Sequence, residues 1–391
     1  MKNAIILFRR YNDFDHTTPI VNYIAKKNPN LKIYYLCTST NWDFKKDKNF
    51  KYLKNLDNVL VSNFEDFFLN FITRKIFYFT KFKINKFFAK LIIKRKLVQL
   101  NPSFVLIDFP NPRKGFLNEL ISISKRLKIK LIGFRHALWN RVITEVNKED
   151  INNLKNMVKD NLDLDYLIFS NKSNLDYAIK FGGLNKSKGL YLGNPRYSSE
   201  WHNKLKENIN KDKIKKIDDK VNVVYMDHSA FLGMNGDNIY RSVKKLSQLD
   251  FVNFVIKPNT NSMHENSVNL STNKLLEFDL NFNDSSIDLI NWADIVICTQ
   301  SSIAVEVLLQ KKILISASHY HYSNQLWDKY QAACFVKDDD SIIDIIKKFF
   351  KIKKNVFYKE ENVKEYLDEI QANELGGNTL ERFNKFLEKQ I

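Results

Sequence analysis

The chain has 391 residues, of which 44% are hydrophobic and 27% are charged, so it is globular rather than disordered and has room for two domains. Its formal net charge of +18 indicates anionic partners, namely nucleotides, anionic lipid or nucleic acid. No apolar run approaches the roughly 18 residues of a membrane span, and the first apolar run is too short for a signal peptide.

The cysteines indicate a reducing compartment. They show no Cys-x-x-Cys spacing, and two of them lie in apolar strand patterns. This is typical of reduced core thiols, so we expect no zinc site and a cytoplasmic setting. The three residues are Cys37, Cys298 and Cys334.

The first half of the chain alternates short apolar runs with amphipathic stretches. The apolar runs predict strands at residues 4–8, 32–37, 59–61, 104–108, 130–134, 166–170 and 190–192. Helices are expected near residues 20–27, 121–129 and 173–180. This alternation predicts a doubly wound parallel sheet of Rossmann type, in which ligands bind at the carboxyl ends of the strands.

The segment after the first strand holds two candidate catalytic residues. Residues 9–19 are polar, and we expect them to form a loop that opens a helix near Ile20. Asp15 and His16 in this loop are candidates for a catalytic base or for acceptor contacts. The alternative is a capped helix start with Pro19 in the first turn.

A second candidate loop follows the strand at residues 130–134. It begins with Arg135 and His136, a pair that can hold a phosphate and move a proton. The alternative is a histidine that only satisfies nearby backbone groups.

Residues 64–100 interleave phenylalanines with lysines and arginines. The aromatic residues recur at helical spacing, which predicts one or two amphipathic helices. A basic, Phe-rich amphipathic segment suits the surface of an anionic membrane, so we expect peripheral contact there. The alternative is a helix that packs in its own domain and exposes lysines to water.

Residues 201–220 are polar and Lys-rich, and a second strand–helix alternation starts after them. Strands are expected at 221–226, 251–256, 276–278, 295–298, 313–315 and 334–336, and helices near 238–247, 303–309, 324–330 and 341–350. Residues 366–387 are expected to be helical, with a break at Gly376-Gly377. Candidate ligand contacts stand at the carboxyl ends of the first two strands. They are His228, Ser229, Lys257 and Asn259.

The stretch from residue 292 to 316 is the most informative one. It predicts a βαβ unit whose turn holds Thr299, Ser301 and Ser302 at a helix N-terminus, which attracts phosphate. Glu306 lies one turn into the helix, where a carboxylate can reach the hydroxyls of a ribose. The alternative is an ordinary βαβ unit with a solvated glutamate.

The order of strand, Ser-Ser turn, helix with an internal Glu and short strand resembles the nucleotide-binding unit of GT-B glycosyltransferases. In that family the turn meets the donor diphosphate and the Glu meets the ribose. The chain departs from the family where the usual glycine before the last strand is replaced by the stretch Gln310-Lys311-Lys312-Ile313.

Two further segments resemble this superfamily. Gly193-Asn194-Pro195-Arg196 is similar to a Gly-x-Pro-Arg segment between the domains of bacterial surface-polysaccharide enzymes, including CDP-glycerol phosphotransferase-like and capsule Kdo-transferase-like proteins. Tyr197 follows where the family often has Asp. The resemblance implies that Arg196 points into a cleft, whereas a plain linker is the alternative. Lys257-Pro258-Asn259 resembles an element whose Lys could meet donor phosphate.

The resemblance implies a GT-B-like architecture of two Rossmann-like domains facing a cleft. Residues 1–200 would be the acceptor domain and residues 201–365 the nucleotide-donor domain. A C-terminal helix commonly crosses back to the first domain in this family, and residues 366–391 are the candidate for it.

The function that this implies is a glycosyltransferase that moves a sugar from a nucleotide-activated donor to a surface-glycan or lipid-linked acceptor. It would work in the cytoplasm, at the inner face of the cell membrane. The alternative within the same fold is a nucleotide-sugar 2-epimerase or a polyol-phosphate transferase. A basic nucleic-acid-binding protein is suggested by charge alone, since no RNP, zinc-finger or helix-turn-helix pattern supports it.

The Asp-x-Asp pair formed by Asp163 and Asp165 leads into a strand instead of following one. We therefore expect no obligatory metal and no cofactor beyond the nucleotide-sugar co-substrate. The leaving diphosphate would be carried by the helix dipole with Ser301, Ser302 and Lys257.

Overall fold

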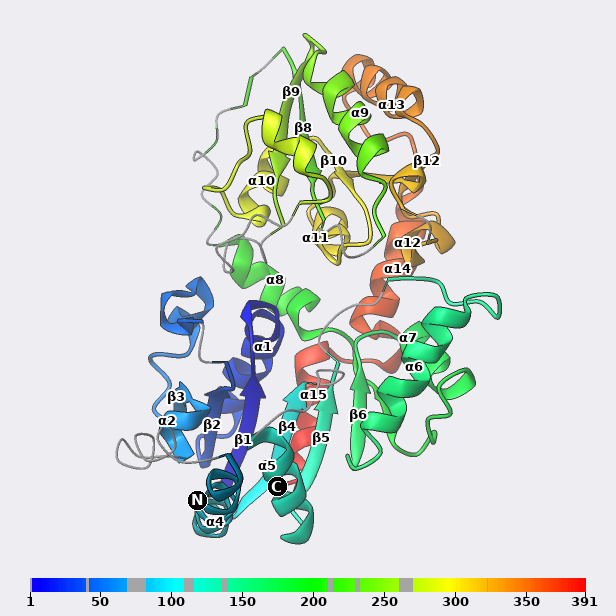
Figure 1. Ribbon diagram of the computed structural model, residues 1–391. Helices are drawn as coiled ribbons and strands as arrows, with labels where there is room; N and C mark the ends of the chain where they lie inside the picture. The colour runs from blue at the N-terminus through cyan, green and yellow to red at the C-terminus, as the bar shows by residue number, and fades with distance from the viewer. Residues whose placement is uncertain are drawn as a thin grey trace. The chain divides into compact units, whose positions relative to one another are not determined.

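The apolar runs of the first half form a seven-stranded parallel sheet in the computed structural model (Figure 1). The model describes residues 2–39, 42–68, 82–108, 116–135, 140–207, 209, 214, 216–217, 219–228, 233–259, 270–321 and 323–391, with the side chains of 82–89 and 116 left aside. The strands are β1 (Lys2–Phe8), β2 (Leu31–Cys37), β3 (Val59–Asn63), β4 (Pro102–Asp108), β5 (Lys130–Phe134), β6 (Tyr166–Phe169) and β7 (Gly189–Tyr191). Their order in the sheet is β3-β2-β1-β4-β5-β6-β7.

Helices cover both faces of this sheet, because strands that are apolar on both sides must be buried on both sides. The helices are α1 (Tyr11–Lys27), α2 (Phe64–Phe68), α4 (Phe82–Leu100), α5 (Phe116–Arg126), α6 (Lys148–Asp160), α7 (Lys172–Lys180) and α15 (Thr379–Glu388). α1 and α15 pack side by side, and Phe383 and Leu387 of α15 join the core beneath α1. Phe134 of β5 meets Phe383 edge-on, with ring centroids 5.4 Å apart.

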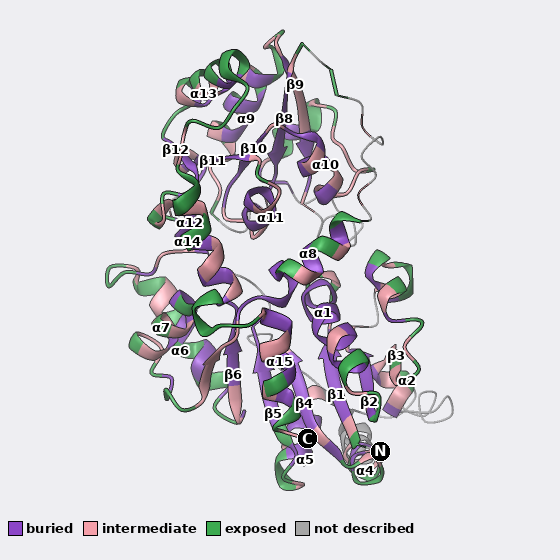
Figure 2. Ribbon diagram, turned by 180° about the vertical axis from the view of Figure 1, so that it is seen from behind, coloured by how far each residue is buried: buried purple, intermediate pink, exposed green. Residues whose placement is uncertain are grey.

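The second half of the chain forms its own five-stranded parallel sheet. The strands are β8 (Val221–Met226), β9 (Val252–Lys257), β10 (Ile295–Cys298), β11 (Ile313–Ala317) and β12 (Cys334–Val336), in the order β12-β11-β10-β8-β9. The helices are α9 (Gly236–Ser247), α10 (Ser286–Trp292), α11 (Ile303–Leu309), α12 (Leu326–Lys329), α13 (Asp339–Ile352) and α14 (Glu360–Gln371). α9 packs against α13 and α10 against α11. Figure 2 shows that the strands of both sheets are mostly buried, whereas helices such as α13 carry exposed residues.

The chain divides into two compact units. Unit 1 comprises Met1–Leu138, Ile143–His202 and Glu369–Ile391, and unit 2 comprises Trp139–Val142 and Asn203–Asp368. A short segment from the first half of the chain, Trp139–Val142, therefore belongs to unit 2, and the C-terminal segment Glu369–Ile391 belongs to unit 1. A further helix, α8 (Ser199–Lys206), spans the boundary at which the chain passes from unit 1 to unit 2. The predicted fold class, two Rossmann-like parallel sheets with helices on their faces, is confirmed.

Two predicted elements were wrong. Residues 9–19 are not a loop, because α1 begins at Tyr11 and contains Asp15, His16 and Pro19. The polar side chains in this stretch are buried and hydrogen-bonded, as Thr17 is to the carbonyl of Asp13 at 2.6 Å, so their composition imitates a loop. Residues 276–278 are not a strand either, since Asn273–Glu277 form a 3₁₀ helix and Leu280 makes only an isolated bridge to Ile256.

Candidate functional site

The carboxyl edge of the unit 2 sheet has a topological switch point between β8 and β10. The chain leaves β8 toward β9 on one side and returns to β10 on the other, so the loops after β8 and β10 diverge there. Such points are where open α/β sheets bind ligands. The residues that follow these strands are His228 after β8 and Thr299, Gln300, Ser301 and Ser302 after β10.

The turn after β10 is tightly built. The backbone N–H of Ser301 donates to the Thr299 carbonyl, and the Ser301 hydroxyl accepts from the backbone N–H of Ile303 at 3.3 Å. Ser302 occupies the N-cap position of α11, but its side chain makes no capping hydrogen bond. Thr299 is buried, whereas Ser301 and Ser302 are partly exposed.

Glu306 is fully buried on α11. Its Oε1 accepts a hydrogen bond from Gln310 Nε2 at 3.0 Å. The alternative of a solvated glutamate was therefore wrong. A buried carboxylate costs free energy unless it is hydrogen-bonded, and Gln310 supplies one such bond within α11.

Arg141 reaches the switch point from the short unit 2 segment Trp139–Val142. Its Nε and Nη2 atoms donate to Gln300 Oε1 at 3.0 and 2.7 Å. The Val142 N–H donates to the Asn324 carbonyl at 2.9 Å, and Arg141 pairs with Gln325 in an antiparallel bridge. These bonds fix the guanidinium beside the β10 turn.

Two histidines lie within electrostatic range of Arg141. Burial and the Arg141 charge lower the pKa of His228 to about 4, although a hydrogen bond to the Gln300 backbone opposes the shift. Burial and Arg141 likewise lower the pKa of His321 to about 4. Both imidazoles are therefore neutral near pH 7. We call Arg141, His228, Gln300 and His321 the switch-point cluster.

The remaining predicted residues of unit 2 are placed less favourably for binding. Lys257 is buried at the end of β9, where its Nζ donates to the carbonyls of Asn281 at 3.1 Å and Phe282 at 3.5 Å. The ammonium thus holds a loop in place. Asn259 is partly exposed two residues further on, and Ser229 lies outside the described residues.

Asp15 and Arg196 of unit 1 form a buried ion pair, with Arg196 Nε 2.7 Å from Asp15 Oδ2. Asn49 Nδ2 donates to the other carboxylate oxygen at 2.8 Å. Burial raises the pKa of a carboxyl, but the Arg196 guanidinium outweighs it and lowers the pKa of Asp15. A carboxylate with both oxygens engaged and a lowered pKa is a poor general base.

His16 is also part of a structural network. Its Nδ1 lies 3.2 Å from Asn194 Oδ1, which in turn accepts a hydrogen bond from the backbone N–H of Arg196 at 3.0 Å. Gly193 has φ +88, and a Cβ there would stand 2.6 Å from the Gln371 carbonyl oxygen. The Gly-Asn-Pro-Arg segment therefore joins β7, α1 and the end of α14 within unit 1.

Arg135 is buried at the end of β5, where burial lowers its pKa to about 10 against the charge of Asp108. Its backbone N–H donates to the Ile168 carbonyl at 2.9 Å. His136, predicted beside it, lies outside the described residues.

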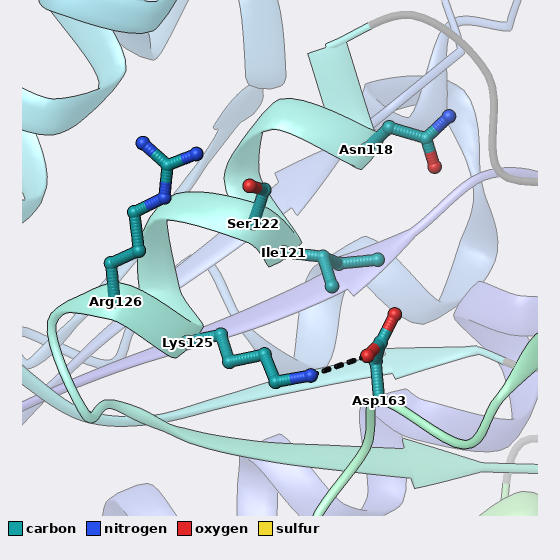
Figure 3. Close-up of a pocket in the computed structure, with 6 residues that line it drawn as sticks. All are labelled: Asn118, Ile121, Ser122, Lys125, Arg126 and Asp163. Carbon is teal, nitrogen blue, oxygen red and sulfur yellow. Dashed lines mark hydrogen bonds and ion pairs between the residues drawn. The ribbon is translucent and has the colours of Figure 1, made fainter.

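The Asp-x-Asp pair makes structural contacts. Asp163 forms an exposed ion pair with Lys125 at 2.5 Å in a groove of about 400 Å³ along α5 (Figure 3). Asp165 pairs with Lys130 and accepts from the Leu131 N–H at 2.8 Å. Both precede β6, so they lie at the amino edge of the sheet, away from the ligand edge. Over the described ranges, no group of three His, Cys, Asp or Glu side chains is arranged to hold a metal.

The basic segment at residues 64–100 lies partly outside the described residues. Of the part that is described, Phe64 and Phe68 are buried, and Lys96 lies 5.0 Å over the ring of Phe67. Leu91 and Val98 of α4 are exposed. Among the described helices, none combines the length and the apolar content that crossing a bilayer requires. Cys37, Cys298 and Cys334 are free and buried.

The sequence patterns did not single out Arg141, Gln300 or His321. Arg141 and Gln300 are 159 residues apart, so no local spacing connects them. The His-Tyr-His run after β11 was a usable signal for His321, because that strand ends at the same sheet edge as β10.

No known family profile matches the chain, and no curated protein matches it in sequence. Solved structures match it over nearly its whole length. A UDP-GlcNAc 2-epimerase from Neisseria meningitidis bound to UDP-GlcNAc has a TM-score of 0.57 at 12% identity, covering 100% of this chain and 99% of its own. A UDP-GlcNAc 2-epimerase from Methanocaldococcus jannaschii has a TM-score of 0.54 at 14% identity, covering 93% and 98%.

A glycosyltransferase from Rickettsia africae matches with a TM-score of 0.52 at 14% identity, covering 100% of this chain and 97% of its own. At these identities the likeness concerns the fold, which hosts more than one activity. The chain therefore has the two-domain, GT-B-like fold that these epimerases and glycosyltransferases share.

Proposed function

We propose that this protein is an enzyme that binds a nucleotide-activated sugar at the switch point of unit 2 and inverts the sugar at C2. The observation that carries the binding part is Glu306, a fully buried carboxylate one turn after the β10 turn. A ribose hydroxyl pair is the partner that suits it. The reaction part rests on the prevalence of 2-epimerases among the similar structures.

Glycosyl transfer is the second candidate, favoured by the glycosyltransferases that match over the whole chain. It would use the same nucleotide site with a surface-glycan or lipid-linked acceptor. In either case Ser301 and Ser302 are proposed to face the diphosphate, and His136 remains a candidate base. We expect no obligatory metal, so EDTA should leave turnover unchanged.

The test is incubation of the protein with UDP-GlcNAc in D₂O, followed by proton NMR. Inversion at C2 exchanges the proton on one face for one from solvent on the other, so the 2-epimer should carry deuterium at C2. Release of UDP that requires an added acceptor would instead favour glycosyl transfer. Absence of both reactions, together with no thermal shift by UDP, CDP, GDP or CMP, would overturn the proposal.

A further inference from the structure

The tautomer of His321 is fixed by its surroundings. The backbone N–H of Ser323 donates to His321 Nδ1 at 3.3 Å. A ring nitrogen that accepts a hydrogen bond carries no proton, so the neutral ring bears its proton on Nε2. His321 is 5% exposed, and its Nε2 makes no hydrogen bond to any residue that the structure describes. A buried N–H without an acceptor costs free energy, so this donor suits a ligand oxygen.

The loop that carries His321 is tied to the β10 turn. His321 pairs with Met234 in an antiparallel bridge, and the Thr299 hydroxyl donates to the Met234 sulfur at 3.9 Å. Four residues after His321, Gln325 pairs with Arg141. The same loop thus positions the imidazole and the guanidinium next to the switch point.

The cluster offers donors and positive charge. Arg141 supplies a guanidinium that Gln300 orients, and His321 supplies the N–H of its Nε2 atom. The neutral His228 ring is already hydrogen-bonded to the Gln300 backbone and lies beside these two donors. Arginine prefers the planar pairs of oxygens that phosphates present. A ligand with several anionic oxygens is the class that matches this combination.

We propose that Arg141 and His321, with Gln300 and His228 beside them, form the subsite for the diphosphate of the nucleotide-activated substrate. Gln300 acts as a positioning residue for the guanidinium. The inference rests on the proposed function for the identity of the ligand, and it adds two residues that would contact the phosphate oxygens. It also moves the cationic contact away from Lys257, whose ammonium holds backbone carbonyls.

Two substitutions of His321 distinguish the role of Nδ1, which accepts from Ser323, from that of Nε2, which would donate to the ligand. In His321→Asn the side-chain oxygen can still accept from Ser323, but the donor at the Nε2 position is lost. In His321→Gln the terminal amide can still donate at that position. His319→Asn is the matched control, because His319 lies on the same loop but bonds to Asp339 at 3.0 Å.

The measurement is calorimetric titration of each folded full-length variant with UDP, with uridine and with inorganic pyrophosphate. Arg141→Gln and His321→Asn should each weaken UDP and pyrophosphate binding about 10-fold or more, the range for a charge-assisted hydrogen bond. Uridine binding should not change. His321→Gln should retain most of the affinity, and His319→Asn all of it.

The outcomes distinguish this inference from the proposed function. If the wild-type protein binds UDP and both variants bind it equally well, the subsite is wrong and the proposed function stands. If pyrophosphate binds in an Arg141-dependent manner but no nucleotide does, the subsite stands and the proposed function fails. If neither UDP nor pyrophosphate binds the wild-type protein, the subsite is overturned together with UDP as the nucleotide.

Discussion

The two units use the polar residues at their strand ends in opposite ways. In unit 1, Asp15 and Arg196 engage each other and Asn49, so residues that look catalytic in the sequence hold elements together. In unit 2, the Nε2 of His321 is buried and has no hydrogen-bond partner among the described residues. A polar residue after a strand is therefore a site candidate when its hydrogen-bonding capacity is left for a ligand.

The largest expected effect comes from breaking the buried ion pair between Arg196 and Asp15 in unit 1. Replacing it with alanine leaves Asp15 buried without its cation, so we expect a loss of about 3–5 kcal/mol in the free energy of unfolding. Urea denaturation measures this. The control is Lys125→Ala, which breaks the exposed ion pair to Asp163 and should cost no more than about 1 kcal/mol.

A folded Arg196→Ala protein with unchanged stability but lost turnover would contradict the structural role. The double variant Asp15→Asn with Arg196→Met should recover part of the stability, because it removes both buried charges.

The stability of the protein should depend on pH through two histidines of unit 2, His228 and His321. His228 and His321 have a pKa of about 4 in the folded protein and about 6.5 when unfolded, so the unfolded state binds more protons between these values. Stability should therefore fall as the pH drops from 6.5 toward 4, by up to about 2 kcal/mol for each histidine between pH 7 and pH 5.

Urea denaturation at pH 7 and pH 5 measures this loss. His321→Asn should lose less stability over that interval than the wild-type protein does. Identical slopes in the two proteins would show that His321 is protonated to the same extent when folded and unfolded.

Replacing Gly193 tests the close contact between its backbone and that of Gln371 in unit 1. Its φ of +88 and the 2.6 Å approach of a built Cβ to the Gln371 carbonyl leave no room for a side chain. Gly193→Ala should cost about 1–3 kcal/mol of stability, measured by thermal denaturation. Gly183→Ala, at φ +73 with nothing within 4 Å of its Cβ, is the control that carries the backbone strain without the contact. Equal losses in both variants would remove the contact with Gln371 from the explanation.

The smallest expected effect concerns the membrane prediction for residues 64–100. Cations near anionic headgroups gain about 1 kcal/mol each, and less at high salt. We expect the protein to sediment with anionic vesicles at low salt and to be released at high salt. Failure to bind either anionic or neutral vesicles would end that prediction.

The sequence was a good guide to the fold and a partial guide to the site. Buried parallel strands are short runs of apolar, β-branched residues, so Lys130–Phe134 and Ile295–Cys298 were found at their predicted bounds. The start of α1 was missed because its polar side chains are buried among partners distant in sequence, such as Asn49 and Arg196.

The same reason explains what was missed at the site. Glu306 and the serines share one βαβ unit, and their spacing along the chain brings them together. Arg141 meets Gln300 through a fold that carries four residues of the first half into unit 2. Such a contact depends on tertiary structure, so it cannot be predicted from the composition or periodicity of the sequence.

The central claim is that unit 2 binds the nucleotide while the Asp15–Arg196 pair of unit 1 is structural. Calorimetric titration with UDP of the wild-type protein, Glu306→Gln and Asp15→Asn tests it most directly. The account predicts that Glu306→Gln weakens UDP binding by about 1–3 kcal/mol, the range for a hydrogen bond to a charged group, and that folded Asp15→Asn binds UDP as the wild type does. Unchanged affinity in Glu306→Gln with lost affinity in Asp15→Asn would contradict it.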